Sequence, residues 1–133
     1  MFTAKETAYL QSQPLARLAT VSSEGQPDAA AVTFHLEHGA LYIGGQNLQN
    51  SRKYRNVVEG NDKVAVIVDD FESRDPWRPR GIRIYGRALT ISRDGQPMLR
   101  IQPETSWSWN IEGPAFVDGK FVTHRSEHQP PIA

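Results

Sequence analysis

The sequence predicts a mainly β protein, a closed antiparallel barrel accompanied by one or two short helices. Three observations predict it: several segments have strand length, turn residues separate them at regular spacing, and one of the apolar runs is rich in valine. A chain of 133 residues corresponds to one domain with a small core. We therefore expect residues 1–133 to form a single domain without internal repeats.

The N-terminal part is expected to contain a helix and then a hairpin. Thr3 and Glu6 have the spacing of a capping box, so we expect a helix within residues 1–13 that ends near Pro14. Strands are expected over residues 15–22 and 28–35, joined by a turn at Glu24-Gly25-Gln26-Pro27.

A second helix is expected over residues 51–59, after a third strand at residues 40–44. Its apolar residues recur at the spacing of one helical face. Asn50 is the predicted N-cap, and Gly60 is the predicted C-cap glycine.

The second half of the chain is expected to supply the remaining strands. Residues 63–68 form the valine-rich run, and residues 80–92 form the longest predicted strand. In that strand Ile82 and Ile84 fall on one face, while Arg83 falls on the other. A polar loop is expected at residues 71–79, between these two strands, and a turn or short helical linker at residues 93–97. A last strand is expected at residues 99–102. We expect little regular structure around Trp107 and Trp109 and a flexible tail at residues 126–133.

Composition excludes several classes of function. Fifteen basic and fifteen acidic residues cancel, so no net field favours nucleic acid or an anionic membrane. Cysteine is absent, which removes disulfides, thiolate metal sites and a thiol nucleophile. The N-terminal segment has no apolar signal sequence, and no apolar run approaches the roughly 20 residues of a membrane span. We therefore expect a cytoplasmic protein.

Recognised catalytic and metal motifs are not found in the sequence. His124 and His128 have the spacing of a helical metal pair, but the proline-rich residues behind them disfavour a helix, and we expect no metal. The serines lack a nucleophile elbow, and Gly44-Gly45 does not form a dinucleotide fingerprint or a P-loop.

The first turn of the second helix carries positive charge where acidic residues are normally preferred. A helix N-terminus carries about half a positive charge, which favours Asp or Glu there. Here Ser51, Arg52 and Lys53 occupy that turn, and the acidic residue, Glu59, comes last. A bound phosphate would relieve this arrangement, because backbone N–H groups, a hydroxyl and two cations would converge on it. The alternative is a solvated basic turn.

Three segments are each weak signals but are specific in their order and spacing. They are Leu18-Ala19-Thr20-Val21 with Gly25-Gln26-Pro27, Leu41-Tyr42-Ile43 with Ser51-Arg52-Lys53, and Arg83-Ile84-Tyr85-Gly86-Arg87-Ala88. Together they resemble the pyridoxamine 5'-phosphate oxidase-like split β-barrel family over about residues 15–112. The resemblance implies a split β-barrel and a homodimer with two cofactor sites at the subunit interface.

Other segments are similar to the deazaflavin (F420)-dependent branch of that family, which includes members of the dehydrotetracycline-reductase type. They are Ser51-Arg52-Lys53-Tyr54-Arg55-Asn56, Asp75-Pro76-Trp77 and Ser106-Trp107-Ser108-Trp109-Asn110. The chain lacks the C-terminal pyridoxal-phosphate-binding pattern of true pyridoxamine phosphate oxidases. F420 and FMN share a tricyclic ring and a ribityl phosphate, so the phosphate site does not separate them.

The resemblance implies an F420-dependent oxidoreductase that transfers a hydride between reduced deazaflavin and an unsaturated small molecule. The alternatives are an FMN-dependent oxidoreductase of the same fold and a non-catalytic F420-binding protein. No general acid or base stands out, which suits a cofactor that carries the chemistry. Solvent remains open as the proton donor, as do Tyr42, Tyr54 and Tyr85.

The resemblance also assigns the cofactor's charged groups. The phosphate is expected at Ser51, Arg52 and Lys53, and the additional negative charge of the F420 tail at Arg55, Arg80 and Arg83. For the arginines around the polar loop, the alternative is a solvated face with ion pairs to Asp69, Asp70, Glu72 and Asp75.

The ring and the substrate are assigned to small and aromatic residues. Glycine in a strand often marks close approach of a ligand to the backbone. The ring is expected against the small residues Ala30, Ala31, Gly44 and Gly45, with Val32, Thr33 and Phe34 at its edge. Trp77, Trp107 and Trp109 are expected to wall the substrate pocket. The alternatives are simple packing or a bulge at Gly45, and ordinary core or interface packing for each tryptophan.

Overall fold

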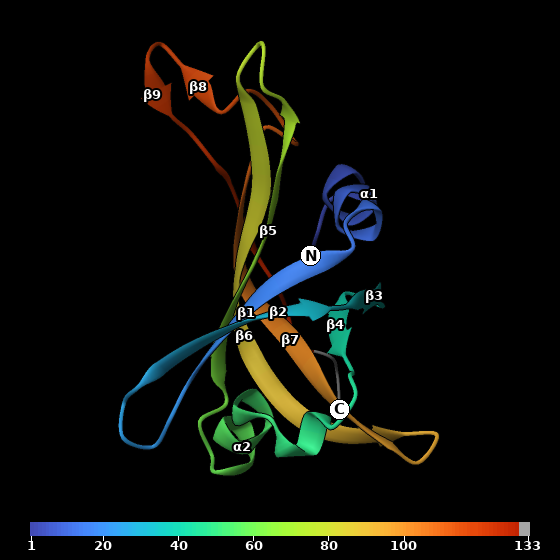
Figure 1. The fold of residues 1–133 in the computed structure, drawn as a ribbon. Coiled ribbons are helices and arrows are strands. Elements are labelled where there is room, and N and C mark those ends of the chain that lie inside the picture. The colour runs from blue at the N-terminus through green and yellow to red at the C-terminus, as the bar shows by residue number, and fades with distance from the viewer. Residues whose placement is uncertain (131–133) are drawn as a thin grey trace.

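The computed structural model describes residues 1–130, which form an antiparallel eight-stranded sheet, a separate two-stranded sheet and two α-helices (Figure 1). Within these residues, neither α-helix is long and apolar enough to cross a membrane. The helices are α1 (Ala4–Ser12), the short 3-10 helix η1 (Leu48–Asn50) and α2 (Arg52–Val58), and the strands are β1 (Leu15–Val21), β2 (Pro27–Thr33), β3 (His35–Glu37), β4 (Ala40–Ile43), β5 (Lys63–Ser73), β6 (Arg78–Arg93), β7 (Gln96–Trp109), β8 (Phe116–Val117), β9 (Lys120–Phe121) and β10 (His124–Glu127).

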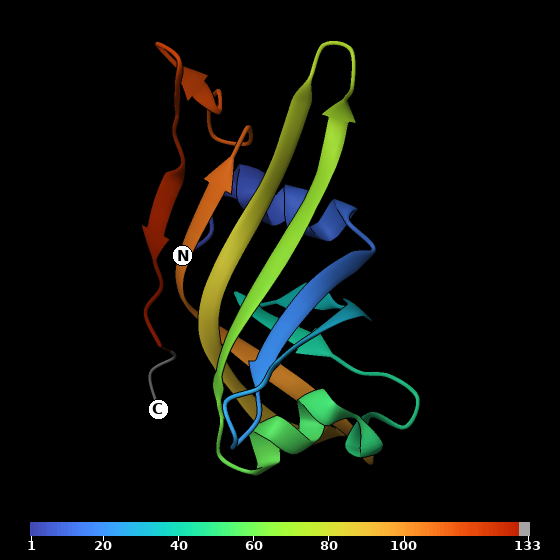
Figure 2. The same ribbon diagram turned by 60° about the vertical axis from the view of Figure 1, so that its left-hand side comes forward.

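The large sheet curls into a barrel. Its strand order is β2-β1-β5-β6-β7-β4-β3, and β10 pairs with β7 outside this path. The first and last strands of the order are consecutive in the chain, because β2 leads into β3 through Phe34. Figure 2 shows the strands wrapping around a common interior, with the β5–β6 hairpin extending beyond it. The prediction of a mainly β, antiparallel barrel with short helices is confirmed.

The alternation predicted for the long strand is confirmed by burial. Ile82 and Ile84 are fully buried in the core, while Arg83 and Tyr85 on the opposite face are exposed. Each fully buried aliphatic side chain contributes about 1.5–3 kcal/mol through removal from water. The same interior receives fully buried side chains from β1, β4, β5 and β7, namely Leu18, Leu41, Ile43, Val66, Val68, Leu99 and Ile101.

The first helix begins with the predicted capping box. The Thr3 hydroxyl accepts a hydrogen bond from the backbone N–H of Glu6 at 3.0 Å, and the Glu6 carboxylate accepts one from the backbone N–H of Thr3 at 3.0 Å. Glu6 is fully buried and also accepts a hydrogen bond from the Ser108 hydroxyl of β7 at 2.5 Å. The capping residue therefore also attaches α1 to the barrel.

Several predicted boundaries are wrong because strands continue through polar segments. The strand predicted at residues 28–35 is two strands, β2 and β3. The polar loop predicted at residues 71–79 is shorter, because β5 and β6 keep pairing to Ser73 and Arg78 beyond the core. Of the two alternatives predicted for residues 93–97, the turn is confirmed and the short helical linker is wrong, because Asp94 and Gly95 form a tight hairpin turn with both residues at positive φ.

The largest error concerns β7, which extends from Gln96 to Trp109 and so places both Trp107 and Trp109 on a strand. The sequence of this strand contains Pro97 and Pro103, and proline is unusual inside a sheet because it has no backbone N–H to donate. Pro103 is tolerated because it lies where the β6–β7 register shifts and the ladder of hydrogen bonds is interrupted. Glu104 is the extra residue of this β-bulge, and its carbonyl accepts from the backbone N–H of His128 at 2.8 Å.

The predicted flexible tail is wrong at its start. Ser126 and Glu127 belong to β10 and pair with Ser106 and Thr105 of β7. Residues 128–130 belong to no helix or strand, and residues 131–133 lie outside the described part of the chain.

Candidate functional site

The basic helix α2 follows β4 and η1 and packs against β1, β2 and β6. Two buried side chains hold it there. Val57 belongs to the core, and the Asn56 amide donates a hydrogen bond to the Thr20 hydroxyl of β1 at 2.9 Å. The position of the first turn of α2 relative to the barrel is therefore well determined by packing and by one buried polar contact.

The N-cap of α2 is Ser51, which corrects the prediction of Asn50. Asn50 belongs to η1, whereas Ser51 is extended (φ −82°, ψ 156°) and its hydroxyl accepts from the backbone N–H of Tyr54 at 3.3 Å. The Ser51 hydroxyl proton is donated to the carbonyl of Leu48 at 2.5 Å. This hydroxyl must rotate away from Leu48 before it can donate to an anion. At the other end of the helix, Gly60 has φ 103°, as expected for the predicted C-cap glycine.

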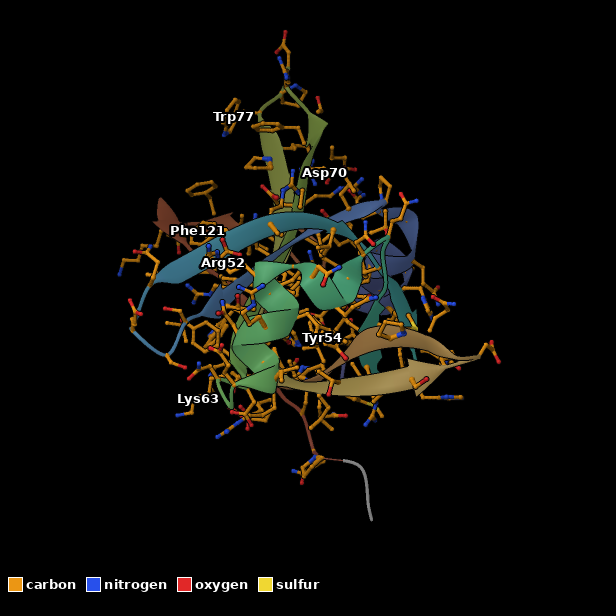
Figure 3. The ribbon with its side chains drawn as sticks, turned by 60° about the horizontal axis from the view of Figure 1, so that its bottom comes forward. Arg52, Tyr54, Lys63, Asp70, Trp77 and Phe121 are labelled. Carbon is orange, nitrogen blue, oxygen red and sulfur yellow. The ribbon has the colours of Figure 1, made fainter. Side chains whose placement is uncertain are left out.

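Among the described residues, the cations of α2 have no acidic side-chain partner. Arg52 and Arg55 are exposed and Lys53 is half-buried, and no ion pair to any of the three occurs within residues 1–130. Figure 3 shows Arg52 on the side of the helix toward β2, and Tyr54 on the other side. The reversed charge of the first turn is thus not compensated within the described chain, so the arrangement fits a bound phosphate.

The predicted ring-contacting residues of β2 divide between two faces of the sheet. Ala31 and Thr33 are exposed, whereas Val32 is 6% exposed and belongs to the core. A ligand on the outside of the barrel can therefore meet the side chains of Ala31 and Thr33 but only the backbone of Val32.

The two glycines after β4 have different roles. A Cβ at Gly44 would meet Met98 at 3.5 Å, an ordinary contact that does not require glycine. Gly45 has φ 144°, a conformation that side chains disfavour, and no atom would lie within 4 Å of its Cβ. Open space beside a conformationally required glycine is compatible with close approach of a flat group.

Arg83 and Trp107 lie in one row of side chains across the sheet. The registers pair Ala31 with Arg17, Arg17 with Ile67, Ile67 with Arg83, and Arg83 with Trp107. We call this row the outer face. The Arg83 guanidinium carbon lies 4.5 Å from the centroid of the Trp107 ring, a cation–π contact. Ala31, Arg83 and Trp107 therefore share one surface, which the sequence alone did not predict.

A groove of about 450 Å³ opens beside the outer face. Its lining includes Ala19, Ala65 and Tyr85, with the cations Lys63 and Arg87. Sequence reasoning missed the groove, because only the register brings these alanines together.

Arg80 lies elsewhere and its charge is already paired. Its guanidinium donates two hydrogen bonds to Asp70, at 2.8 and 3.1 Å, and lies over the Tyr9 ring. The Tyr9 hydroxyl donates to the same carboxylate at 2.9 Å. These contacts tie α1 to the β5–β6 hairpin. Arg80 thus follows the alternative given in the sequence analysis, an ion pair with an acidic residue of the same chain. A cofactor anion could contact Arg80 only by competing with Asp70 for its guanidinium.

This cluster shifts two pKa values. Hydrogen bonds from Arg80 lower the pKa of Asp70. Burial, together with the hydrogen bond to Asp70, raises the pKa of Tyr9. Because the folded-state pKa of Asp70 lies below its unfolded value of about 3.9, its contribution to stability is present above that pH and is lost as the pH falls through the folded-state pKa.

We expect Asp70→Asn to lower the free energy of unfolding at pH 7 by about 1–3 kcal/mol, because it weakens charged hydrogen bonds to Arg80. The difference from the parent chain should shrink as the pH is lowered below about 4. Urea unfolding at pH 7 and pH 3 measures both effects. Asp69→Asn is the matched control, because Asp69 forms an exposed pair with Arg17 and should change stability by less than about 1 kcal/mol at either pH.

The three tryptophans pack against different aromatic neighbours within one chain. Trp77 is 66% exposed at the far end of the β5–β6 hairpin, away from α2 (Figure 3), and packs against Phe71 with ring centroids 4.6 Å apart. Trp109 covers Gly81, where a Cβ would lie 2.5 Å from its ring. Gly81 is a packing residue that the sequence analysis missed, although a glycine within a strand signals close approach.

Comparison with known proteins shows the family to which this chain belongs. A family model described as Pyridoxamine 5'-phosphate oxidase matches residues 2–101. The chain is 40% identical over 122 residues to a 5a,11a-dehydrotetracycline/5a,11a-dehydrooxytetracycline reductase from Streptomyces rimosus subsp. rimosus. The aligned residues cover 84% of this chain and 85% of that protein.

Solved structures show the same fold at low identity. A conserved hypothetical protein from Mycobacterium tuberculosis superposes with a TM-score of 0.69 at 18% identity, covering 82% of this chain and 84% of that one. An F420 reductase superposes with a TM-score of 0.57 at 20% identity, covering 74% of this chain and 93% of that one. With most of the chain matched by the family model and a relative at 40% identity, this protein belongs to the pyridoxamine 5'-phosphate oxidase family.

Proposed function

We propose that this protein is an F420-dependent oxidoreductase that transfers a hydride between reduced deazaflavin and an unsaturated small molecule. The observation that carries the proposal is the 40% identity, over 84% of the chain, to a protein named as a reductase of dehydrotetracyclines. A solved structure named as an F420 reductase supports the choice of cofactor by sharing the fold.

The phosphate would be held at α2. Arg52 and Lys53 supply two cations without ion pairs to the described residues, and their backbone N–H groups point out of the helix N-terminus. Ser51 adds a hydroxyl once it turns from the carbonyl of Leu48. When bound, the deazaflavin supplies the hydride, and the chain's own task is to hold and orient it.

The ring would lie along the exposed side of β2. Ala31 has no side chain beyond Cβ, and Thr33 offers a hydroxyl on the same exposed side. Arg83 forms no ion pair within residues 1–130, so its guanidinium on the outer face would be open to a tail anion, whereas Arg55 lies nearer the phosphate on α2. Among the three tyrosines proposed as proton donor, Tyr85 lies in β6 at 4.9 Å from the Trp107 ring.

We further propose a homodimer in which a second copy covers the outer face. Its centre is built from Ala31, Ile67 and Trp107, with the alanine-lined groove beside it. Apolar centres with aromatic residues and arginine are typical of protein interfaces. In such a dimer, tryptophans that are separated within one chain could approach a single substrate pocket.

Titration of the purified protein with F420 and with FMN tests the cofactor. We expect F420 to bind at micromolar concentrations, and native mass spectrometry of the complex to show a dimer with two ligands. Absence of binding by either compound at tens of micromolar would overturn the proposal. A yellow protein as purified would favour the FMN alternative, and tight F420 binding without turnover of enone or quinone acceptors would favour a non-catalytic binding protein.

A further inference from the structure

A second cavity, of about 660 Å³, lies between α1, the β3–β4 turn and the segment that follows β10. This volume is within the range of about 300–1,000 Å³ that is typical of small-molecule sites. Its lining includes Phe2, Leu36, His38, Gln102 and His128. No residue of α2 or β2 lines it, so it is separate from the proposed cofactor site.

The body of a ligand in this cavity would be apolar and uncharged. Phe2 is 8% exposed and belongs to the core, and Leu36 packs against that core from the β3 side. Among the described residues that line the cavity, no side chain is charged; Met1 also lines it, and its N-terminal ammonium donates a hydrogen bond to the carbonyl of Glu127 at 3.0 Å. An ion placed between Phe2 and Leu36 would therefore lose its hydration without a charged side chain beside it, which is strongly unfavourable.

His128 supplies a polar group held in one orientation. Its Nε2 lies 2.8 Å from the Ser106 hydroxyl, and its ring packs against Phe2 with centroids 4.4 Å apart. Burial lowers the pKa of His128, so the neutral imidazole is favoured at neutral pH. With Nε2 engaged, Nδ1 has no hydrogen-bond partner among residues 1–130 and is the nitrogen left for a ligand.

His38 adds a second imidazole from the β3–β4 turn. It has φ 50° and precedes Gly39 at φ 77°, so the pair occupies the two central positions of a tight hairpin. Asn, Asp or Gly is preferred at such positions. The sequence thus places an exposed ring at the rim of the cavity where a smaller residue would satisfy the turn.

We infer that this cavity binds a neutral aromatic alcohol, with its ring against Phe2 and Leu36 and its hydroxyl hydrogen-bonded to Nδ1 of His128. A hydroxyl both donates and accepts, so it satisfies Nδ1 in either tautomer of the imidazole. A cationic amine is disfavoured by the Met1 ammonium, and no cationic side chain lines the cavity beside Phe2 and Leu36 to pair with a carboxylate.

The test uses 2-naphthol as the probe, with binding followed by calorimetry and by the ¹⁵N shifts of the His128 imidazole. We expect saturable binding that shifts Nδ1, and about tenfold weaker binding by His128→Phe, which keeps the aromatic contact with Phe2 but removes the hydrogen bond. His124→Phe is the matched control, because His124 is exposed on β10 and does not line this cavity. It should bind as the parent chain does.

Filling the cavity provides an independent check. Leu36→Trp should abolish binding of 2-naphthol, and Gln11→Trp, from the exposed surface of α1, should do the same if the first variant does not fold. Unshifted His128 nitrogens at millimolar 2-naphthol, or unchanged affinity in a folded filled variant, would overturn the inference. No F420 is used, so this outcome is independent of the proposed oxidoreductase activity.

Discussion

Gly86→Ala is expected to lower the free energy of unfolding by about 3 kcal/mol or more, the upper range for overpacking. A Cβ at this position would lie 2.5 Å from the backbone carbonyl oxygen of Gln102 and 3.2 Å from Cγ2 of Ile101. Both neighbours belong to β7, and the closer one is backbone, which cannot turn away as a flexible side chain can. The clash occurs in the middle of the β6–β7 ladder, so relief requires displacing paired strands.

Urea unfolding of the purified variant measures this loss. Gly113→Ala is the matched control, because no atom lies within 4 Å of its Cβ position and its φ is not in the left-handed region. Gly44→Ala makes only a contact at 3.5 Å and should also be tolerated. A Gly86→Ala variant within about 0.5 kcal/mol of the parent would mean that the two strands separate easily at the bulge.

Replacing both Arg52 and Lys53 by alanine should weaken F420 binding more than tenfold. Each charged hydrogen bond is worth about 1.5–3 kcal/mol, and losing one already corresponds to about tenfold or more. The folded structure should change little, because Arg52 is exposed and Ser51 and Val57 keep the cap and the packing of α2.

Fluorescence titration with F420 measures the affinity, and circular dichroism confirms that the variant folds. The double variant Lys5→Ala/Lys120→Ala removes the same charge from exposed positions on α1 and β9 and should bind F420 as the parent does. Equal affinities for all three proteins would place the phosphate at a site other than α2.

The local part of the fold could be predicted from the sequence. The capping box at Thr3 and Glu6 and the C-cap glycine Gly60 were readable because each depends on residues only a few positions apart. The two faces of β6 were readable because strand alternation has a period of two. The cations of α2 were noticed for the same reason, since the helix and its reversed charge lie within one short segment.

The parts that were missed depend on pairing between distant residues. β7 and β10 carry few apolar runs, and they become strands because β6 and β7 offer them partners. The pairing of Arg80 with Asp70 depends on the β5–β6 register. Likewise, the position of Trp109 over Gly81 appears only when the strands are aligned. No periodicity within a single segment contains this information.

The extra residue Glu104 acts as a phase change along β7. On one side of it the inward residues are Ser106 and Ser108, and on the other they are Ile101 and Leu99, so odd and even positions exchange roles. Because the bulge takes Glu104 out of the regular ladder, one strand can bury Leu99 and Ile101 and still present Trp107 and Trp109 on its outer side. If Glu104 paired as an ordinary strand residue, every side chain beyond it would change face and both indoles would turn toward the barrel interior.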